Sequence, residues 1–229
     1  MKNSSWIAID GDSGSGKTTI GKLLARKIGF EFIDSGLLYR AATYAIIAHK
    51  ENKDRKSWVD IIKNSSFDIR QNTVFIDKKG FSQDELHTKE IDNLVSSVST
   101  VKDIRAIITK ILRNIADGKN VVMAGRDIGS VVLKEAFLKI YITATLRVRA
   151  ERRYKELINK GNIITFDEVL RNLKKRDTID SSRSVSPLII PEDAYVIDTS
   201  TLLPEKVIEK IIQFIKGREY DLRSTTRTF

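Results

Sequence analysis

The sequence has 229 residues, with 40 Lys and Arg, 30 Asp and Glu and no Cys, and its formal net charge is +10. No apolar run approaches the ~20 residues that a membrane span needs. The first residues, MKNSSW, lack the apolar core of a signal peptide, and disulfides and cysteine-ligated metals are excluded. We therefore expect a globular, cytoplasmic protein with no membrane partner. The charge favours polyanions, a class that includes nucleotides and nucleic acids.

The first predicted elements are a strand, a glycine-rich loop and a helix. WIAID, residues 6–10, is typical of a buried strand, and the apolar residues of 20–28 lie on one helical face that ends at Gly29. Between them GDSGSGKT, residues 11–18, matches G-x-x-x-x-G-K-[ST] at each fixed position. Glycines let the backbone curl so that several N–H groups point into one hollow, and the following helix adds its positive end. The sequence therefore predicts a nucleotide phosphate site.

Two side chains of this phosphate loop have separate tasks. Lys17 supplies a mobile positive charge for the outer phosphate oxygens, and the Thr18 hydroxyl can ligate the magnesium ion that accompanies them. The residues expected to bind the nucleotide are Gly11, Asp12, Ser13, Gly14, Ser15, Gly16, Lys17, Thr18 and Thr19.

Four further buried strands are predicted, and helical patterns separate them. The strands are FEFIDSG from Phe30, NVVMAG from Asn120, LKIYITA from Leu138 and AYVIDTS from Ala194. The helical patterns cover about 36–49, 104–115 up to Gly118, and 207–215 up to Gly217. This alternation predicts a parallel sheet with helices on both faces. The motifs DSG, GRD and DTS directly follow strands, so we expect them around the phosphate loop.

Two segments fall outside this alternation. Residues 64–90 contain short alternating stretches and turn signals, which predict a small β-rich insert. Residues 218–229 are polar, and we expect a mobile tail there.

The phosphate loop alone leaves several classes of protein open. The Asn-Lys-x-Asp motif that selects guanine is missing, and Asp127 follows its strand only after a glycine and an arginine, unlike the Walker B acid of an ATPase. The basic residues of 147–183 alternate with acids, whereas an RNA-binding tract would more often be purely basic with interleaved aromatics. A nucleic-acid-stimulated ATPase is therefore an alternative that only the net charge favours.

Four blocks of the sequence, in this order, resemble the bacterial cytidylate kinase family. They are GDSGSGKTT, FIDSGLLYRA, GRDIGSVVL and KKRDTIDSSRSVSPL, and the resemblance extends from about Ile7 to Ile215. It implies one kinase domain over 1–229 with a three-layer α/β/α P-loop kinase fold, an NMP-binding region at 36–116 that carries the insert, and a mobile lid at 149–163. It also implies transfer of phosphate from ATP, with Mg²⁺, to CMP or dCMP. We expect a monomer that binds no nucleic acid.

The resemblance also implies which residues bind the acceptor nucleotide. Ser35, Tyr39, Arg40 and Arg126 would border the monophosphate; Ser96, Arg105 and Asp127 would read the base; Arg176, Asp180 and Arg183 would bind ribose and phosphate. Arginine suits such work because its planar fork holds two phosphate oxygens and stays charged. Cytosine offers one amino donor and two acceptors, which an aspartate beside an arginine complements.

The residues expected to act on the transferring phosphoryl group are Lys17, Arg126, Arg149, Arg152 and Arg153. The sequence leaves open which of the three lid arginines reaches it. Two positions depart from the family pattern: Ala124 stands where an acid is usual, and His87 where an arginine is common. A kinase that acts on UMP or on another small hydroxyl compound is the nearest alternative function.

Overall fold

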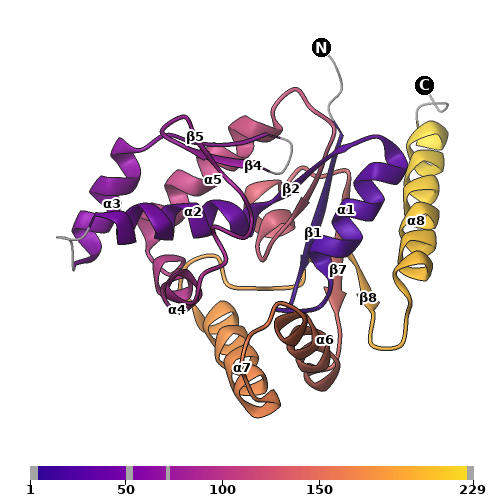
Figure 1. The fold of residues 1–229 in the computed structure, drawn as a ribbon. Helices are drawn as coiled ribbons and strands as arrows, with labels where there is room; N and C mark the ends of the chain where they lie inside the picture. The colour runs from indigo at the N-terminus through magenta and orange to yellow at the C-terminus, as the bar shows by residue number, and fades with distance from the viewer. Residues whose placement is uncertain (1–4, 50–53, 71–72, 226–229) are drawn as a thin grey trace.

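The computed structural model describes residues 5–49, 54–70 and 73–225. Its centre is a sheet in the order β2-β6-β1-β7-β8, in which all neighbouring strands are parallel (Figure 1). The strands are β1 (Trp6–Gly11), β2 (Glu31–Asp34), β6 (Val121–Ala124), β7 (Leu138–Thr143) and β8 (Ala194–Asp198). All five lie where the sequence predicts a buried strand.

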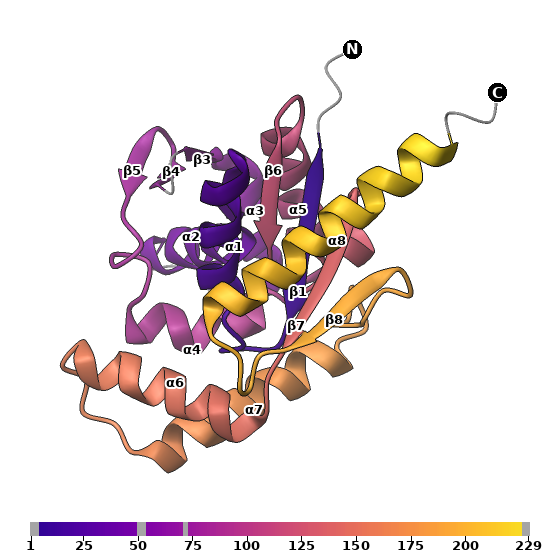
Figure 2. The ribbon, with the colours of Figure 1, turned by 90° about the vertical axis from the view of Figure 1, so that its right-hand side faces the viewer.

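Helices cover both faces of this sheet. Side chains of β1 alternate between the faces: Ile7 and Ile9 pack in the cluster that includes α1 and α8, and Ala8 packs on the side of α2 and α5 (Figure 2). The helices are α1 (Lys17–Ile28), α2 (Ser35–Ala48), α3 (Arg55–Asn64), α4 (Lys89–Val98), α5 (Lys102–Ala116), α6 (Leu146–Asn159), α7 (Phe166–Ser182) and α8 (Pro204–Thr225), with a π-helical turn η1 (Ile128–Val132). The predicted three-layer α/β/α fold is confirmed.

The segment 64–90 contains the predicted short strands. β3 (Phe67–Arg70), β4 (Thr73–Ile76) and β5 (Lys79–Phe81) form an antiparallel three-stranded sheet. The buried side chains of this sheet belong to the same apolar cluster as α2 and α5. The insert is thus attached to the main body through a shared core.

The last helix is longer than predicted. α8 passes through Gly217, where the sequence predicts its end, and continues to Thr225. A glycine inside a helix costs only about 1 kcal/mol relative to alanine, and the neighbouring Lys, Arg and Glu residues favour helix. The prediction at Gly217 is therefore wrong, and residues 218–225, expected to form a mobile tail, are helical. Residues 226–229 of the expected tail lie outside the described residues.

α6 and α7 pack against each other beyond the carboxyl ends of the strands (Figure 2). Ala150, Val169 and Leu173 form a small core between them, separate from the two clusters on the sheet. The segment expected to be a lid, 149–163, covers most of α6 and the turn that follows it. In the described part of the chain, no helix is long and apolar enough to cross a membrane.

Candidate active site

A cavity of about 840 Å³ lies at the carboxyl edge of the sheet. Its walls come from the phosphate loop, α2, α4, α5, the GRD motif, α6, α7 and residues 199–207. The motifs that follow β2, β6 and β8 all contribute to it, as the sequence predicts. The chain therefore gathers its polar motifs where parallel sheets bind ligands.

The phosphate loop requires backbone conformations with positive φ, which glycine adopts readily. φ is 147° at Gly11 and 98° at Gly16, the residue that precedes α1. A Cβ atom on Gly11 would overlap the carbonyl oxygen of Ile142 in β7. Gly11 therefore lets the loop pass close to β7, and residues 13–19 then line the cavity at the start of α1.

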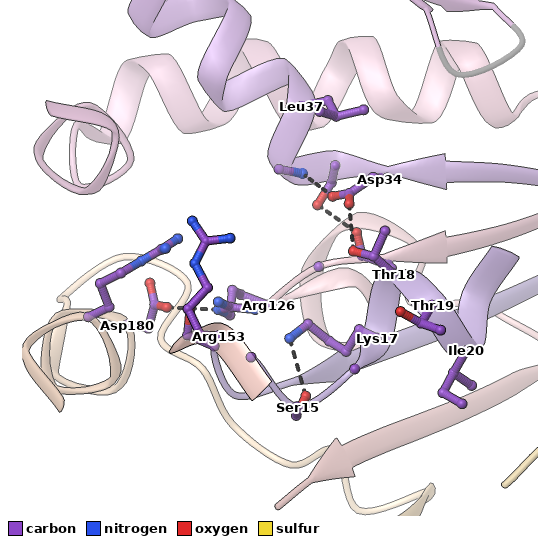
Figure 3. Close-up of a pocket in the computed structure, with 18 of the residues that line it drawn as sticks. Ser15, Lys17, Thr18, Thr19, Ile20, Asp34, Leu37, Arg126, Arg153 and Asp180 are labelled. Atoms are coloured by element: carbon purple, nitrogen blue, oxygen red, sulfur yellow. Dashed lines mark hydrogen bonds and ion pairs between the residues drawn. The ribbon is translucent and has the colours of Figure 1, made fainter. Parts of the chain in front are cut away.

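Lys17 lies in the curve of this loop (Figure 3). Its ammonium group donates to the Asp12 carbonyl oxygen at 2.5 Å and to Ser15 Oγ at 3.5 Å. Burial, reinforced by the charge of Arg126, holds the pKa of Lys17 well below its ordinary value. Phosphate groups in the cavity would favour the charged form, because they bring the opposite charge within a few ångströms.

Thr18 and Asp34 place two oxygen groups side by side. Thr18 Oγ1 donates to Asp34 Oδ2 at 2.8 Å, and the other oxygen of Asp34 caps α2 by accepting from the Gly36 N–H at 3.0 Å (Figure 3). A hydroxyl and a carboxylate fit Mg²⁺, which uses one or two protein carboxylates together with substrate phosphates and water. The described residues hold no group of three or more His, Cys, Asp or Glu that could bind a metal by themselves.

Arg126 joins three segments that are distant in the sequence. Its Nε donates to Asp180 Oδ2 in α7 at 2.7 Å (Figure 3). Its Nη1 donates to the Gly11 carbonyl oxygen at 3.0 Å. Burial alone would lower the pKa of Arg126, but the Asp180 carboxylate raises it above its ordinary value. Arg126 therefore stays charged beside the phosphate loop.

Arg105 and Asp127 form a buried ion pair in the wall of the cavity. Arg105 Nη2 donates to Asp127 Oδ2, and Nη1 donates to the Ser99 carbonyl oxygen at 3.0 Å. The Tyr39 ring lies 5.2 Å from the Arg105 guanidinium carbon, within reach of a cation–π interaction. Arg183 Nη2 is 4.0 Å from the other carboxylate oxygen of Asp127.

Two buried nitrogen donors around this pair have no hydrogen-bond partner among the described residues. They are Nε of Arg105 and Nη2 of Arg183. A buried donor without an acceptor is costly, so such atoms are rare in folded proteins. Acceptors on a bound nucleotide would satisfy them.

Arg40 and Arg153 meet at one carboxylate. Arg40 Nη2 donates to Asp92 Oδ1 of α4 at 2.5 Å, while Arg153 Nη2 of α6 lies 3.9 Å from Asp92 Oδ2. Arg40 Nη1 also donates to the Leu86 carbonyl oxygen at 3.1 Å. Asp92 therefore links the α2–α4 side of the cavity to α6.

Positive charge is concentrated on this side of the cavity. Burial, and then the charge of Arg40, lowers the pKa of His87 to about 4. Burial, and then the charges of Arg126 and Arg40, lowers the pKa of Arg176 to about 10. Both side chains line the cavity. Burial is the larger cause of both shifts, and the neighbouring arginines add to it; a phosphate group in the cavity would oppose their contribution.

The three lid arginines occupy different places. Arg152 lines the cavity and donates to the Thr199 carbonyl oxygen at 2.6 Å, and Arg153 lines it on the side of Asp92. Arg149 is 6% exposed and is not among the lining residues. It donates to Asp177 Oδ2 at 2.6 Å and to the Ser13 carbonyl oxygen at 2.9 Å. The structure therefore brings Arg152 and Arg153 to the cavity and uses Arg149 to tie α6 and α7 to the phosphate loop.

The two predicted serines both line the cavity. Ser35 is buried, and its Oγ donates to the carbonyl oxygen of Ala124 at 2.9 Å. Ser96 is half-buried in α4, with Ser99 beside it in the wall. The small side chain of Ala124, the first departure from the family pattern, is 1% exposed.

Most residues predicted for the site converge on the cavity. The lining residues include Ser13–Thr19 of the loop and all ten predicted acceptor-site residues, which are Ser35, Tyr39, Arg40, Ser96, Arg105, Arg126, Asp127, Arg176, Asp180 and Arg183. Gly11, Asp12 and Arg149 lie outside the lining. The predictions overlooked Asp34 and Thr199, although both belong to motifs, DSG and DTS, that were expected near the loop. Ser99 carries no sequence signal that would have identified it.

Comparison with known proteins agrees with this geometry. A family model described as Cytidylate kinase matches residues 7–217. The cytidylate kinase of Caldanaerobacter subterraneus subsp. tengcongensis is 45% identical over 213 residues, which are 92% of this chain and 94% of that protein. That of Alkaliphilus oremlandii is 41% identical over 212 residues, 92% of this chain and 97% of that protein.

The fold has relatives among solved structures at low sequence identity. A gluconokinase from Sinorhizobium meliloti aligns with a TM-score of 0.52 at 14% identity, over 98% of this chain and 99% of that chain. This likeness concerns the fold alone. The family match and the two close relatives cover more than nine-tenths of the chain and confirm the resemblance seen in the four sequence blocks. The chain belongs to the cytidylate kinase family.

Proposed function

We propose that this protein transfers the γ-phosphoryl group of ATP directly to the phosphate of CMP or dCMP, giving ADP and CDP or dCDP. The observation that carries the proposal is the buried Arg105–Asp127 pair in the wall of the cavity that also contains the phosphate loop. A base-reading pair and a triphosphate site in one cavity suit a nucleoside monophosphate kinase.

The pair complements cytosine. Asp127 accepts a hydrogen bond from the 4-amino group, and Arg105 donates to the unprotonated ring nitrogen. Uracil reverses both groups, since it has a carbonyl oxygen at position 4 and a proton on the ring nitrogen. UMP would therefore leave polar groups unmatched in a dry pocket, at roughly 1–3 kcal/mol for each.

The remaining acceptor contacts follow from the positions of the arginines. Arg40, Arg126 and Arg176 surround the space next to the phosphate loop and bind the monophosphate. Asp180, which holds Arg126 and lies 3.5 Å from Arg183 Nη1, accepts from the ribose. Arg40 and Arg126 thereby keep the attacking phosphate oxygen pointed toward the loop that holds the donor.

Catalysis is proposed to rest on position and charge rather than on a covalent intermediate. The acceptor oxygen bonds to the γ-phosphorus as the bond to the ADP oxygen breaks, and Lys17 and Arg153 stabilise the charge on the transferring group. Thr18 and Asp34 would hold Mg²⁺, which when bound neutralises charge on the ATP phosphates. Arg149 and Asp177 position the loop without contacting the reacting atoms.

Two regions are proposed to move during this cycle. Residues 36–116 form the NMP-binding region, and 149–163 form the lid. Closing of the lid brings Arg152 and Arg153 over the phosphates and excludes water, which would otherwise hydrolyse ATP. We expect the protein to act as a monomer in the cytoplasm without a nucleic-acid partner.

A substrate panel tests the proposal. ADP release is followed with ATP, Mg²⁺ and each of CMP, dCMP, UMP and AMP, with a Lys17→Met preparation as the control for contaminating kinases. CMP and dCMP should be turned over with the highest kcat/KM. Equal kcat/KM for UMP would contradict base reading by Arg105 and Asp127. ATP hydrolysis that RNA stimulates and that needs no monophosphate would instead support the nucleic-acid-stimulated ATPase.

A further inference from the structure

Asp10 is a buried aspartate that the proposed reaction does not use. It lies in β1, is 2% exposed and is not among the residues that line the cavity. Its side chain points to the face of the sheet where η1 packs, because residues alternate along a strand and Ile9 faces α1. Both carboxylate oxygens are used there: Oδ1 accepts from the Ile128 N–H at 2.8 Å, and Oδ2 accepts from the Gly129 N–H at 2.7 Å.

These two N–H groups are the first of η1, and Asp127 is the residue just before them. An aspartate at this N-cap position ordinarily uses its own carboxylate to accept from the first turn. Asp127 makes no such bond, and its carboxylate pairs with Arg105 instead. Asp10, 118 residues away in the sequence, caps the turn in its place.

β1 also forms hydrogen bonds with Gly125 and Arg126, the two residues that precede Asp127. The Gly125 N–H donates to the Ile9 carbonyl oxygen at 2.9 Å, and Arg126 Nη1 donates to the Gly11 carbonyl oxygen at 3.0 Å. Residues 125–129 are therefore fixed to β1 on both sides of Asp127. Among the described residues, Asp10 is the one side chain of β1 that takes part.

We propose that Asp10 is a positioning residue for base recognition: by capping η1 from β1, it leaves the Asp127 carboxylate free to face Arg105 and the cytosine. This inference rests on the proposed role of Asp127 in base reading. Asp10 then caps the helical turn, and Asp127 recognises the base.

The electrostatic surroundings of Asp10 make this role sensitive to pH. Burial raises the pKa of Asp10 to about 6, against the lowering effect of the Gly129 and Ile128 N–H groups. Asp127 raises this pKa further and Lys17 lowers it. On the neighbouring β7, Tyr141 pairs in register with Asp10, and the Lys139 side chain packs against Gly129. A protonated Asp10 would turn an O–H toward one of the two N–H donors and lose a cap bond.

The test compares Asp10→Asn with the unmodified protein. Asparagine keeps the size of the side chain but has only one acceptor oxygen. The N–H groups of Ile128 and Gly129 need one acceptor each. The ratio of kcat/KM for CMP to that for UMP should fall by about tenfold, while KM for ATP changes by less than about threefold. Asp54→Asn is the matched control, because Asp54 also accepts from a helix N-terminal N–H, that of Ser57 at 2.7 Å, but lies at the exposed start of α3.

The pH dependence separates positioning from a general structural role. The CMP-to-UMP ratio cancels the titration of the nucleotide phosphate, which both substrates share. For the unmodified protein it should fall between about pH 7.5 and about pH 5.5, and for Asp10→Asn it should stay low and flat. A ratio that does not change with pH in the unmodified protein would overturn the inference even if Asp10→Asn fails to fold.

The proposed function and this inference fail in distinguishable ways. If Asp127→Asn changes the CMP-to-UMP ratio and a folded Asp10→Asn does not, Asp10 has no positioning role and base reading stands. If neither substitution changes the ratio, Asp127 does not read the base, and the inference falls with it.

Discussion

The Arg105 guanidinium and the Asp127 carboxylate form an ion pair whose side chains are 3% and 5% exposed. Arg105 comes from α5 and Asp127 from the turn between β6 and η1, and both lie in the wall of the cavity that contains the phosphate loop. Removing one member of such a pair leaves the other charge buried without its partner, which is strongly destabilising. Substitutions at these two positions should therefore preserve the shape of the side chain. Their effect is best measured as the ratio of kcat/KM for CMP to kcat/KM for UMP.

Asp127→Asn should lower kcat/KM for CMP about tenfold or more and narrow the gap to UMP. Asparagine has nearly the same shape, but it can turn its NH₂ group toward the carbonyl oxygen of uracil. Steady-state kinetics with both nucleotides measures the ratio, and a thermal melt checks folding. Asp103→Asn, an exposed position in the first turn of α5, is the control. An unchanged ratio in a folded Asp127→Asn protein would remove Asp127 from base recognition.

Lys17→Met should reduce kcat by at least about a hundredfold and change KM for CMP little, because the ammonium group interacts most strongly with phosphate oxygens as charge moves during transfer. The fold should persist, since methionine fills much of the same space. Lys27→Met, at the exposed end of α1, should behave like the unmodified protein. A near-normal kcat for Lys17→Met would contradict the assignment of GDSGSGKT as the donor site.

Asp180→Asn should weaken CMP and dCMP, each by about tenfold in KM. The Asp180 carboxylate fixes the Arg126 side chain by accepting from its Nε at 2.7 Å. Without this charge-assisted bond, both nucleotides lose an ordered phosphate contact. If Asp180 also accepts from the 2′-hydroxyl, CMP should lose more affinity than dCMP, which makes dCMP the internal control. Equal and normal KM values for both nucleotides would place Asp180 outside the substrate site.

Hydrogen exchange in residues 149–161 should slow when a bisubstrate analogue binds, because lid closure orders this backbone. The slowing should be larger after Arg153 than at Arg149, which already bonds to Ser13 and Asp177. β6 serves as the reference segment, since it is buried in the sheet in either state. Identical exchange with and without the analogue would leave α6 as a fixed wall of the cavity and not a lid.

The free energy of unfolding should depend on pH through the ionisation of the buried Asp10 carboxyl group. Its folded pKa, about 6, is above the ordinary value of 3.8, so its contribution to stability is present below about pH 4 and is lost as the pH rises through 6. Relative to Asp10→Asn, the unmodified protein should lose up to roughly 3 kcal/mol of unfolding free energy between about pH 4 and pH 7. Urea titrations at several pH values measure this difference, and a constant difference would show that Asp10 does not titrate in this range.

Local sequence patterns were enough to predict the phosphate loop and the strands of the central sheet. The phosphate loop is one contiguous motif, and its glycines and following helix are adjacent in the chain, so GDSGSGKT could be interpreted without any distant residue. The five strands and the alternation with helices follow from apolar runs and periodicity in the same way. The family resemblance that the four blocks revealed then predicted ten acceptor-site residues, and all ten line the cavity.

The contacts of the charged side chains could not be predicted in this way, because they depend on neighbours from distant segments of the chain. Arg149, Arg152 and Arg153 are close together on the same helix, α6. Arg149 is nevertheless buried and bonded to Ser13 and Asp177, whereas the other two line the cavity. Asp34 joined the site only when β2 placed it beside Thr18. Asp10 and Ile128 are 118 residues apart, and no local pattern connects them. Periodicity and motifs describe how a chain behaves over a few residues, whereas hydrogen bonds between parallel strands and the turns that follow them are set by which strands become neighbours in the sheet.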